Sequence, residues 1–122
     1  MTKILIVEDE VLAAMSMSMV LRRLGYKVLD PAPNAEEAVK SIAANHPDVI
    51  LMDVSLVGET DGIDLARQIH AQFGTPIVFI TGYVDQDIQE QAMKIDPIGY
   101  FVKPVDFKKV QHTIDTWLEQ HP

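Results

Sequence analysis

Four apolar residues, Val49 to Met52, run without interruption into an aspartate, Asp53. A continuous apolar run of this length, β-branched at its start, predicts a strand that is buried on both faces of a parallel sheet. A carboxylate directly after such a strand is costly to bury unless the protein uses its charge. We therefore expect Asp53 to lie at the carboxyl end of a central strand and to act as a nucleophile.

Further apolar runs of the same kind occur along the chain, and helical spacing of apolar residues follows each one. The predicted strands cover residues 3–7, 26–29, 48–52, 77–80 and 99–102. Strands separated by helices pair in parallel through right-handed crossovers, which leaves helices on both faces of the sheet. The sequence therefore predicts an α/β fold: a doubly wound five-stranded parallel sheet of flavodoxin-like order 2-1-3-4-5. Ligands of such folds bind near the switch between strands 1 and 3.

The predicted helices differ in how strongly the sequence specifies them. Asn34, followed three residues later by a glutamate, predicts an N-cap with a capping box. The segment 85–95 is only weakly helical, because its few apolar residues stand on a glutamine-rich background. In the first helix, we expect three methionines to fill gaps in the core: Met15, Met17 and Met19.

The composition fits one domain spanning residues 1–122, with 48% hydrophobic and 23% charged residues. Ten Lys and Arg against eighteen Asp and Glu give a net charge of −8, which argues against binding to nucleic acid or to an anionic membrane. The chain has no cysteine, which excludes disulfides, thiolate metal sites and cysteine nucleophiles. No apolar run approaches the roughly 18 residues of a membrane span, and a strand starts at Lys3, so we expect a cytoplasmic protein without a signal peptide.

Polar residues follow four of the predicted strands, and in a parallel sheet all of them reach the same edge. They are Glu8 and Asp9, Asp53, Thr81, and Lys103. Carboxylates brought close together repel one another unless a cation holds them, and an oxygen-only ligand set indicates Mg²⁺. Magnesium, a lysine and a threonine hydroxyl together can bind the oxygens of a phosphoryl group. The aspartate among them is placed to attack phosphorus and form an aspartyl phosphate.

Other activities found on such folds are less well supported by the sequence. A flavin or dinucleotide site needs a glycine-rich turn after the first strand, whereas this turn is Glu8–Glu10 and would repel a bare phosphate. A P-loop is absent. A phosphatase with a paired-aspartate nucleophile motif would need an acid two residues after Asp53, where Ser55 stands.

Five short motifs occur in order over roughly residues 3–118: Ile4–Glu10, Met52–Asp53, Asp61–Gly62, Phe79–Gly82 and Gly99–Pro104. Together they resemble the receiver domain of two-component response regulators. The resemblance implies that Asp53 accepts a phosphoryl group from a histidine kinase or a histidine phosphotransferase. It also implies a phosphoacceptor signalling domain, not a classical enzyme, which assists its own phosphorylation and dephosphorylation.

The resemblance further assigns the metal ligands. Asp9 would bind Mg²⁺ directly, Glu8 would help through a water molecule, and Asp53 itself would be a ligand. The main-chain carbonyl of Ser55 would complete the protein ligands.

The same resemblance assigns the phosphate contacts and the switch. Lys103 and Thr81 would bind the phosphoryl oxygens, Tyr100 would be the switch residue, and the Lys103–Pro104 peptide bond would be cis. Thr81 moving toward the phosphate would make room for Tyr100 to swing inward. We expect the signal to leave through the face formed by helix 85–95, strand 99–102 and the final helix, which could also support a homodimer.

Several positions depart from the commonest receiver pattern. The first acid is Glu8 instead of aspartate, and the loop 56–62 lacks the usual proline and is about one residue longer. Gly82 stands where alanine is common, Asp96–Ile98 replaces the usual Gly-Ala, and Tyr83 follows Thr81 by two residues.

Two other classes of function stay open at this point. One is a docking module that is not phosphorylated, a pseudo-receiver that acts by protein contact alone. The other is a Mg²⁺-dependent phosphohydrolase, for which we find no general acid or base beside Asp53. The sequence does not distinguish a stand-alone receiver from one domain of a longer protein, and it names neither the kinase nor the downstream target.

Overall fold

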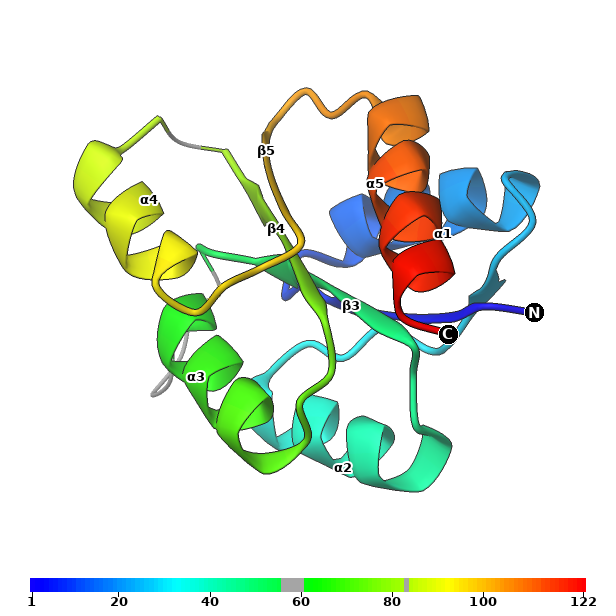
Figure 1. Cartoon of the computed structure of the whole chain (residues 1–122), viewed down its shortest axis with the longest axis horizontal. Coiled ribbons are helices and arrows are strands. Elements are labelled where there is room, and N and C mark those ends of the chain that lie inside the picture. Colours follow the sequence, from blue (N-terminus) through cyan, green and yellow to red (C-terminus); the bar gives the residue numbers. More distant parts are fainter. Residues whose placement is uncertain (56–60, 83) are drawn as a thin grey trace.

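The computed structural model describes residues 1–55, 61–82 and 84–122. Within them, strands and helices alternate along the chain as predicted (Figure 1). The elements are β1 (Lys3–Val7), α1 (Val11–Arg23), β2 (Lys27–Val28), α2 (Ala35–Asn45), β3 (Val49–Asp53), α3 (Gly62–Gln72), β4 (Ile77–Thr81), α4 (Gln86–Met93), β5 (Gly99–Val102) and α5 (Phe107–Gln120).

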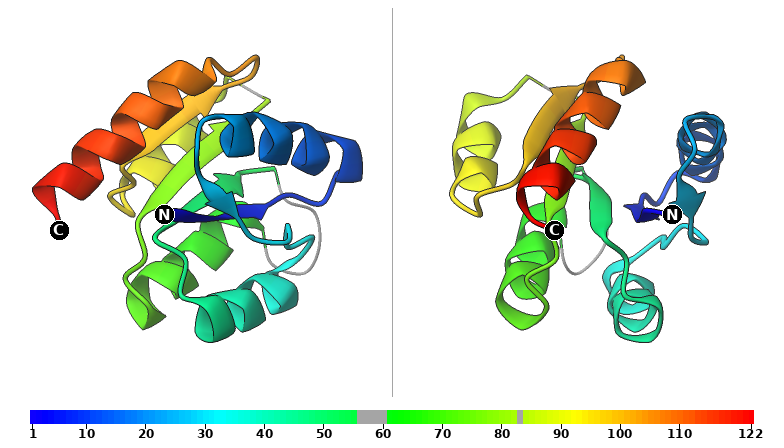
Figure 2. Two further views of the ribbon diagram at one scale, coloured as in Figure 1. Left: turned by 90° about the vertical axis from the view of Figure 1, so that its right-hand side faces the viewer. Right: turned by 45° about the vertical axis from the view of Figure 1, so that its right-hand side comes forward.

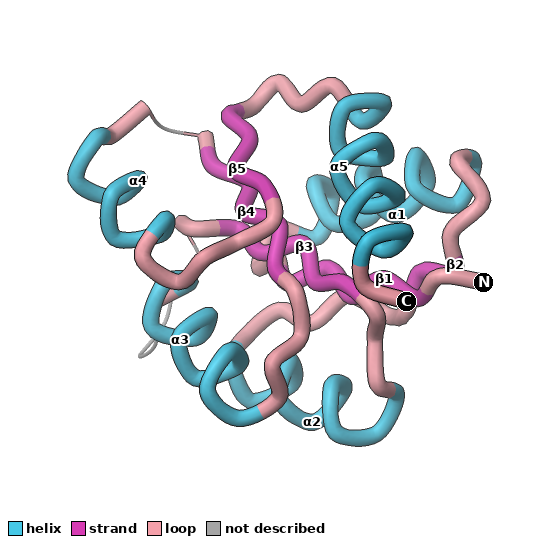
Figure 3. The backbone as a smooth tube through the Cα atoms, viewed as in Figure 1, coloured by secondary structure: helices cyan, strands magenta, loops and turns pink. Residues whose placement is uncertain are grey.

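The strands form one parallel sheet in the order β2-β1-β3-β4-β5, which confirms the predicted topology (Figure 3). Its register brings the strand ends level with one another. Val7 at the end of β1 pairs with Met52, Asp53 pairs with Ile80, and Thr81 pairs with Val102. The residues that follow these strands therefore emerge side by side at the carboxyl edge of the sheet.

Helices cover both faces of the sheet, as Figures 1 and 2 show. Successive strand residues point to opposite faces, so β1 contributes to two separate cores. Leu5 and Val7 belong to the core under α2, α3 and α4. Ile4 and Ile6 belong to the core under α1 and α5. Because both faces of the central strands are buried, their sequences are unbroken apolar runs.

The structure corrects the boundaries of three predicted strands, of which β4 gains Thr81 as its last residue. β2 has only two residues, Lys27 and Val28, because it pairs with β1 alone at the edge of the sheet. β3 begins at Val49 and includes Asp53, whose main chain still pairs with β4. Asp53 is therefore the last residue of a fully buried strand, and not the first residue of a loop.

Asparagine or aspartate side chains cap the starts of several helices. Asn34 Oδ1 accepts a hydrogen bond from the Glu37 N–H at 2.9 Å, as predicted. Asp61 and Asp85 cap α3 and α4 in the same way. α2 ends at Asn45, and its C-cap residue His46 has a φ of 49° in the left-handed region. Asp96 before β5 has a φ of 59°.

The prediction for the methionines of α1 was wrong at two of three positions. Met17 is buried with Leu21, whereas Met15 and Met19 are exposed on the outer face together with Leu12. α1 is apolar on nearly all sides, so the spacing of its apolar residues did not identify the face that packs on the sheet.

Both chain ends lie at the edge of the sheet where the strands begin, opposite the carboxyl edge. β1 starts there, and α5 runs back toward it, so that the N and C labels in Figure 1 stand on the same side of the molecule. Among the described residues, no helix is long and apolar enough to cross a membrane.

Candidate functional site

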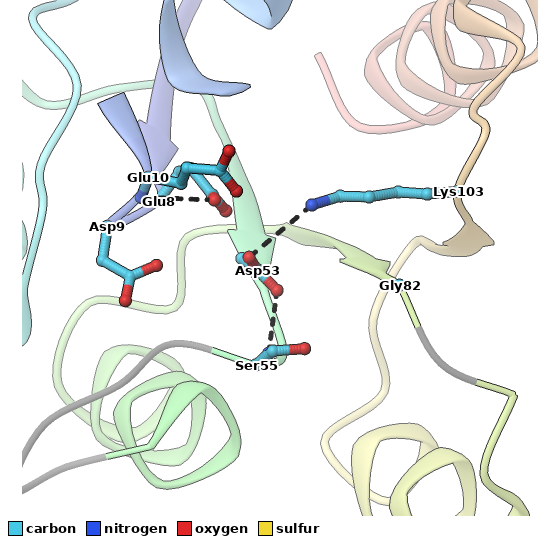
Figure 4. A pocket seen from close by; sticks show the side chains of 7 residues that line it. All are labelled: Glu8, Asp9, Glu10, Asp53, Ser55, Gly82 and Lys103. Carbon is cyan, nitrogen blue, oxygen red and sulfur yellow. Dashed lines mark hydrogen bonds and ion pairs between the residues drawn. The ribbon is translucent and has the colours of Figure 1, made fainter. Parts of the chain in front are cut away.

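A pocket of about 460 Å³ opens at the carboxyl edge of the sheet (Figure 4). It lies between the ends of β1 and β3 on one side and the ends of β4 and β5 on the other. The ends of β1 and β3 in its wall form the switch point at which the sequence predicts a ligand site. The residues that line it are Glu8, Asp9, Glu10, Asp53, Ser55, Gly82 and Lys103.

The Asp53 side chain is 7% exposed and points into this pocket. Its two oxygens face different groups. The Ser55 N–H donates a hydrogen bond to Oδ1 at 2.8 Å, and Lys103 Nζ lies 3.8 Å from Oδ2. The backbone donor fixes the orientation of the carboxylate, and the ammonium group partly compensates its charge.

Glu8 is even more buried, at 3% exposure, although it carries a carboxyl group. Its Oε1 accepts a long hydrogen bond from the Glu10 N–H at 3.4 Å, while Oε2 is buried without any hydrogen-bond partner. Burial, together with the nearby Asp53 carboxylate, raises the pKa of Glu8 from 4.5 to about 8. A buried carboxyl oxygen without a partner is rare in proteins, and a bound water or ion is one explanation for such an atom.

These acids fit a hard divalent cation. Carboxylate oxygens of Glu8, Asp9 and Asp53 all lie within 4.8 Å of one another. Such an all-oxygen set matches the ligands of Mg²⁺, which usually keeps several waters. The unpartnered Oε2 of Glu8 gives the cation an oxygen that nothing else in the described chain uses.

Lys103 and Thr81 stand at the ends of the two strands on the other side of the pocket. The Lys103 N–H donates to the Thr81 carbonyl at 2.8 Å, which holds the two residues together. The Lys103–Pro104 peptide bond is cis, as predicted. Thr81 is 1% exposed and does not itself line the pocket, whereas the neighbouring Gly82 does.

Tyr100 is connected directly to Thr81. Burial raises the pKa of the Tyr100 hydroxyl, and a hydrogen bond with Thr81 acts in the opposite direction. The Tyr100 ring is half-buried and packs at a tilt of 59° on Phe79, with ring centroids 6.3 Å apart. The two residues predicted to form the switch are therefore in contact.

The structure thus brings Glu8, Asp9, Asp53, Ser55 and Lys103 to one pocket, and places Thr81 and Tyr100 beside it. Sequence reasoning gave no role to Glu10, whose N–H contacts Glu8 and whose place right after two acids could have suggested one. The predictions for Tyr83 and for the loop residues 56–60 lie outside the described residues.

This fold, with acids, a lysine and a buried aspartate at the carboxyl edge, defines a receiver domain. The model of the response regulator receiver domain family matches residues 4–115. The chain therefore belongs to this family of signalling domains, as the sequence motifs indicated.

Known relatives and solved structures agree with this assignment. The transcriptional regulatory protein PdtaR of Mycobacterium tuberculosis is 36% identical over 102 residues, which cover 84% of this chain and 49% of PdtaR. ResD of Bacillus subtilis is 37% identical over 110 residues, 89% of this chain and 45% of ResD. The chain thus spans about half the length of these curated relatives.

Among solved structures, the signal receiver domain of a modulated diguanylate cyclase from Desulfovibrio desulfuricans G20 is 36% identical, with a TM-score of 0.89 over 97% of this chain and 94% of that one. A response regulator receiver domain from Clostridium thermocellum is 25% identical, with a TM-score of 0.90 over 99% of this chain and 97% of that one.

Proposed function

We propose that this chain receives a phosphoryl group on Asp53 from the phosphohistidine of a histidine kinase or a histidine phosphotransferase. The observation that carries the proposal is the position of the Asp53 carboxylate. It ends a buried strand, has a backbone donor on one oxygen and an ammonium group near the other, and stands in a pocket whose acids suit a cation.

In the transfer step, a carboxylate oxygen of Asp53 attacks phosphorus, a P–O bond forms and the P–N bond of phosphohistidine breaks. The bonding electrons leave with the imidazole. Lys103 Nζ donates to a phosphoryl oxygen, and the Thr81 hydroxyl donates to another. Glu8, Asp9, Asp53 and the Ser55 carbonyl would hold Mg²⁺, which neutralises charge on the phosphoryl oxygens when bound.

The same groups support the loss of the phosphoryl group to water, which returns Asp53 to a carboxylate. Lys103 again stabilises the charge on the phosphoryl oxygens. The domain therefore assists its own phosphorylation and dephosphorylation while acting as a signalling element, and its proposed readout is binding to a protein partner.

The readout proceeds through Thr81 and Tyr100. When the Thr81 hydroxyl turns to a phosphoryl oxygen, its hydrogen bond with Tyr100 breaks and the ring is free to rotate. Tyr100 lies on β5, beside α4, and among the described residues of α4 only Ala92 is fully buried. We place the output on the face of α4, β5 and α5, and a second copy of the chain is one candidate partner for it.

Intact mass after incubation with acetyl phosphate and Mg²⁺ tests the proposal. We expect a phosphoryl adduct on the wild type, no adduct on Asp53→Asn, and no adduct when EDTA is added first. Asp30→Asn, an exposed aspartate outside the pocket, is the matched control and should behave as the wild type. An adduct on Asp53→Asn would contradict the proposal, and absence of both the adduct and Mg²⁺ binding in the wild type would favour the docking module.

A further inference from the structure

Gly62, the first residue of α3, lies directly against the main chain that follows the phosphoacceptor. A Cβ atom at this position would overlap the carbonyl oxygen of Asp53, and it would lie 2.9 Å from both the Cα and the carbonyl oxygen of Val54. Real Cβ atoms essentially never come this close to other atoms. All three atoms belong to the backbone, which cannot turn aside as the end of a side chain can.

The need for glycine here comes from space and not from backbone conformation. Gly62 does not have a positive φ. Alanine is favoured over glycine within a helix by up to about 1 kcal/mol. A glycine at a position where alanine would suit the helix therefore serves the contact with Asp53 and Val54.

Neither the main chain at Val54 nor α3 can move away from this contact without losing other interactions. The Val54 N–H donates to the Ile80 carbonyl at 3.0 Å, which holds the segment against β4. On the other side, α3 is fixed by its buried side chains, including Leu65 and Ile69, which are both fully buried. A Cβ at Gly62 must therefore displace the two peptide groups that join Asp53 to Ser55.

This displacement would act on the proposed chemistry. The Ser55 N–H orients the Asp53 carboxylate at 2.8 Å, and Ser55 is also the residue whose carbonyl is proposed as a metal ligand. Both groups depend on the path of the chain that Gly62 touches.

We propose that Gly62 is a positioning residue: its missing Cβ lets α3 fix the Asp53–Ser55 main chain, and so sets the geometry of the metal and phosphoacceptor site. This inference rests on the proposed function. It adds that the start of α3 determines how well the pocket binds Mg²⁺.

The test compares Gly62→Ala with the wild type. We expect Mg²⁺ affinity, measured by calorimetric titration of the folded protein, to fall about tenfold to 100-fold, which is the usual effect of losing support for metal ligands. The rate of adduct formation with acetyl phosphate should fall with it. The amide NMR signals of residues 53–55 should shift, while those of β1 stay in place.

Ile114→Ala is the matched control, because it removes a fully buried side chain from α5 on the opposite face of the sheet and has no part in the pocket or in the packing of α3. It should lower the free energy of unfolding and leave the Mg²⁺ affinity of the folded protein unchanged. Equal affinities of Gly62→Ala and the wild type would overturn the inference and leave the proposed function intact. If the wild type itself binds no Mg²⁺, the proposed function fails and the inference fails with it.

The comparison is repeated in a background with His46→Gly and Asp96→Gly, two substitutions that relieve left-handed residues away from the pocket. This background should raise the free energy of unfolding, so that a destabilised Gly62→Ala variant can still fold. A Gly62→Ala chain that stays unfolded even there would overturn the positioning role, because the glycine would then be required for folding as such.

Discussion

At the scale of single residues, Glu8 shows how the fold changes the chemistry of a side chain. Burial, and then Asp53, raise the pKa of its carboxyl group to about 8 in the folded, metal-free protein, whereas the unfolded chain keeps a value near 4.5. Between these values the folded state binds more protons than the unfolded state. The free energy of unfolding therefore falls as the pH rises through this window.

The prediction for Glu8 is a loss of stability from about pH 4.5 to about pH 8 in the presence of EDTA. Urea unfolding at several pH values measures it. Glu8→Gln, which cannot ionise, should remove this part of the pH dependence, whereas the exposed Glu119→Gln should keep it. A wild type and Glu8→Gln with parallel pH profiles would contradict the assignment.

A second prediction at this scale concerns two residues with left-handed backbone conformations. His46 and Asp96 have φ values of 49° and 59°, which cost an ordinary residue about 1 kcal/mol and glycine very little. We expect His46→Gly and Asp96→Gly each to raise the free energy of unfolding by about 0.5–1 kcal/mol.

Chemical denaturation of the two single variants checks this prediction. Ala44→Gly, in the last turn of α2 where the backbone is helical, serves as the opposite control and should lose up to about 1 kcal/mol. Destabilisation by either left-handed substitution would show that the native side chain makes a stabilising contact of its own.

At the scale of elements, α3 and α4 differ in how firmly they are held. α3 buries five residues, including Leu65 and Ile69, whereas α4 has eight residues of which only Ala92 is fully buried. Few buried apolar contacts allow an element to open locally without unfolding of the whole domain. This property suits the proposed role of α4 in the output face.

We expect the amide hydrogens of α4 to exchange faster than those of α3 in the unphosphorylated protein. Hydrogen exchange followed by NMR or mass spectrometry measures the difference, with the fully buried strand β3 as a second reference. Equal protection of α3 and α4 would argue against α4 as the responsive element, and unchanged exchange after phosphorylation would argue against the output face.

The elements also show what the sequence could predict. β3 was predicted almost to the residue, because an apolar run buried on both faces is unambiguous. The strand-end residues followed from parallel topology alone. The inner face of α1 was predicted poorly, because apolar residues surround that helix. The contact of Gly62 with Asp53 could not be predicted, because it depends on how closely two segments approach in space.

At the scale of the whole molecule, the pocket exists only when the sheet is complete. Glu8, Asp53 and Lys103 stand at the ends of three different strands, so the unfolded chain has no equivalent site. A ligand that binds only the folded state stabilises it by mass action.

We therefore expect Mg²⁺ to raise the free energy of unfolding, by about 2.7 kcal/mol at a concentration 100 times its dissociation constant. Thermal unfolding with and without EDTA measures the effect. Asp9→Asn should weaken it strongly, and Asp30→Asn should leave it unchanged. A melting temperature that does not respond to Mg²⁺ in the wild type would contradict the metal site.

The path of the chain has a practical consequence. β1 begins, and α5 ends, at the edge of the sheet opposite the pocket. Anything joined to either terminus is therefore attached at that opposite edge. An affinity tag, a flexible tether to a solid support or a fused fluorescent protein would leave the mouth of the pocket open. The domain can thus be immobilised from either end while Asp53, the proposed phosphoacceptor, stays accessible from the pocket side.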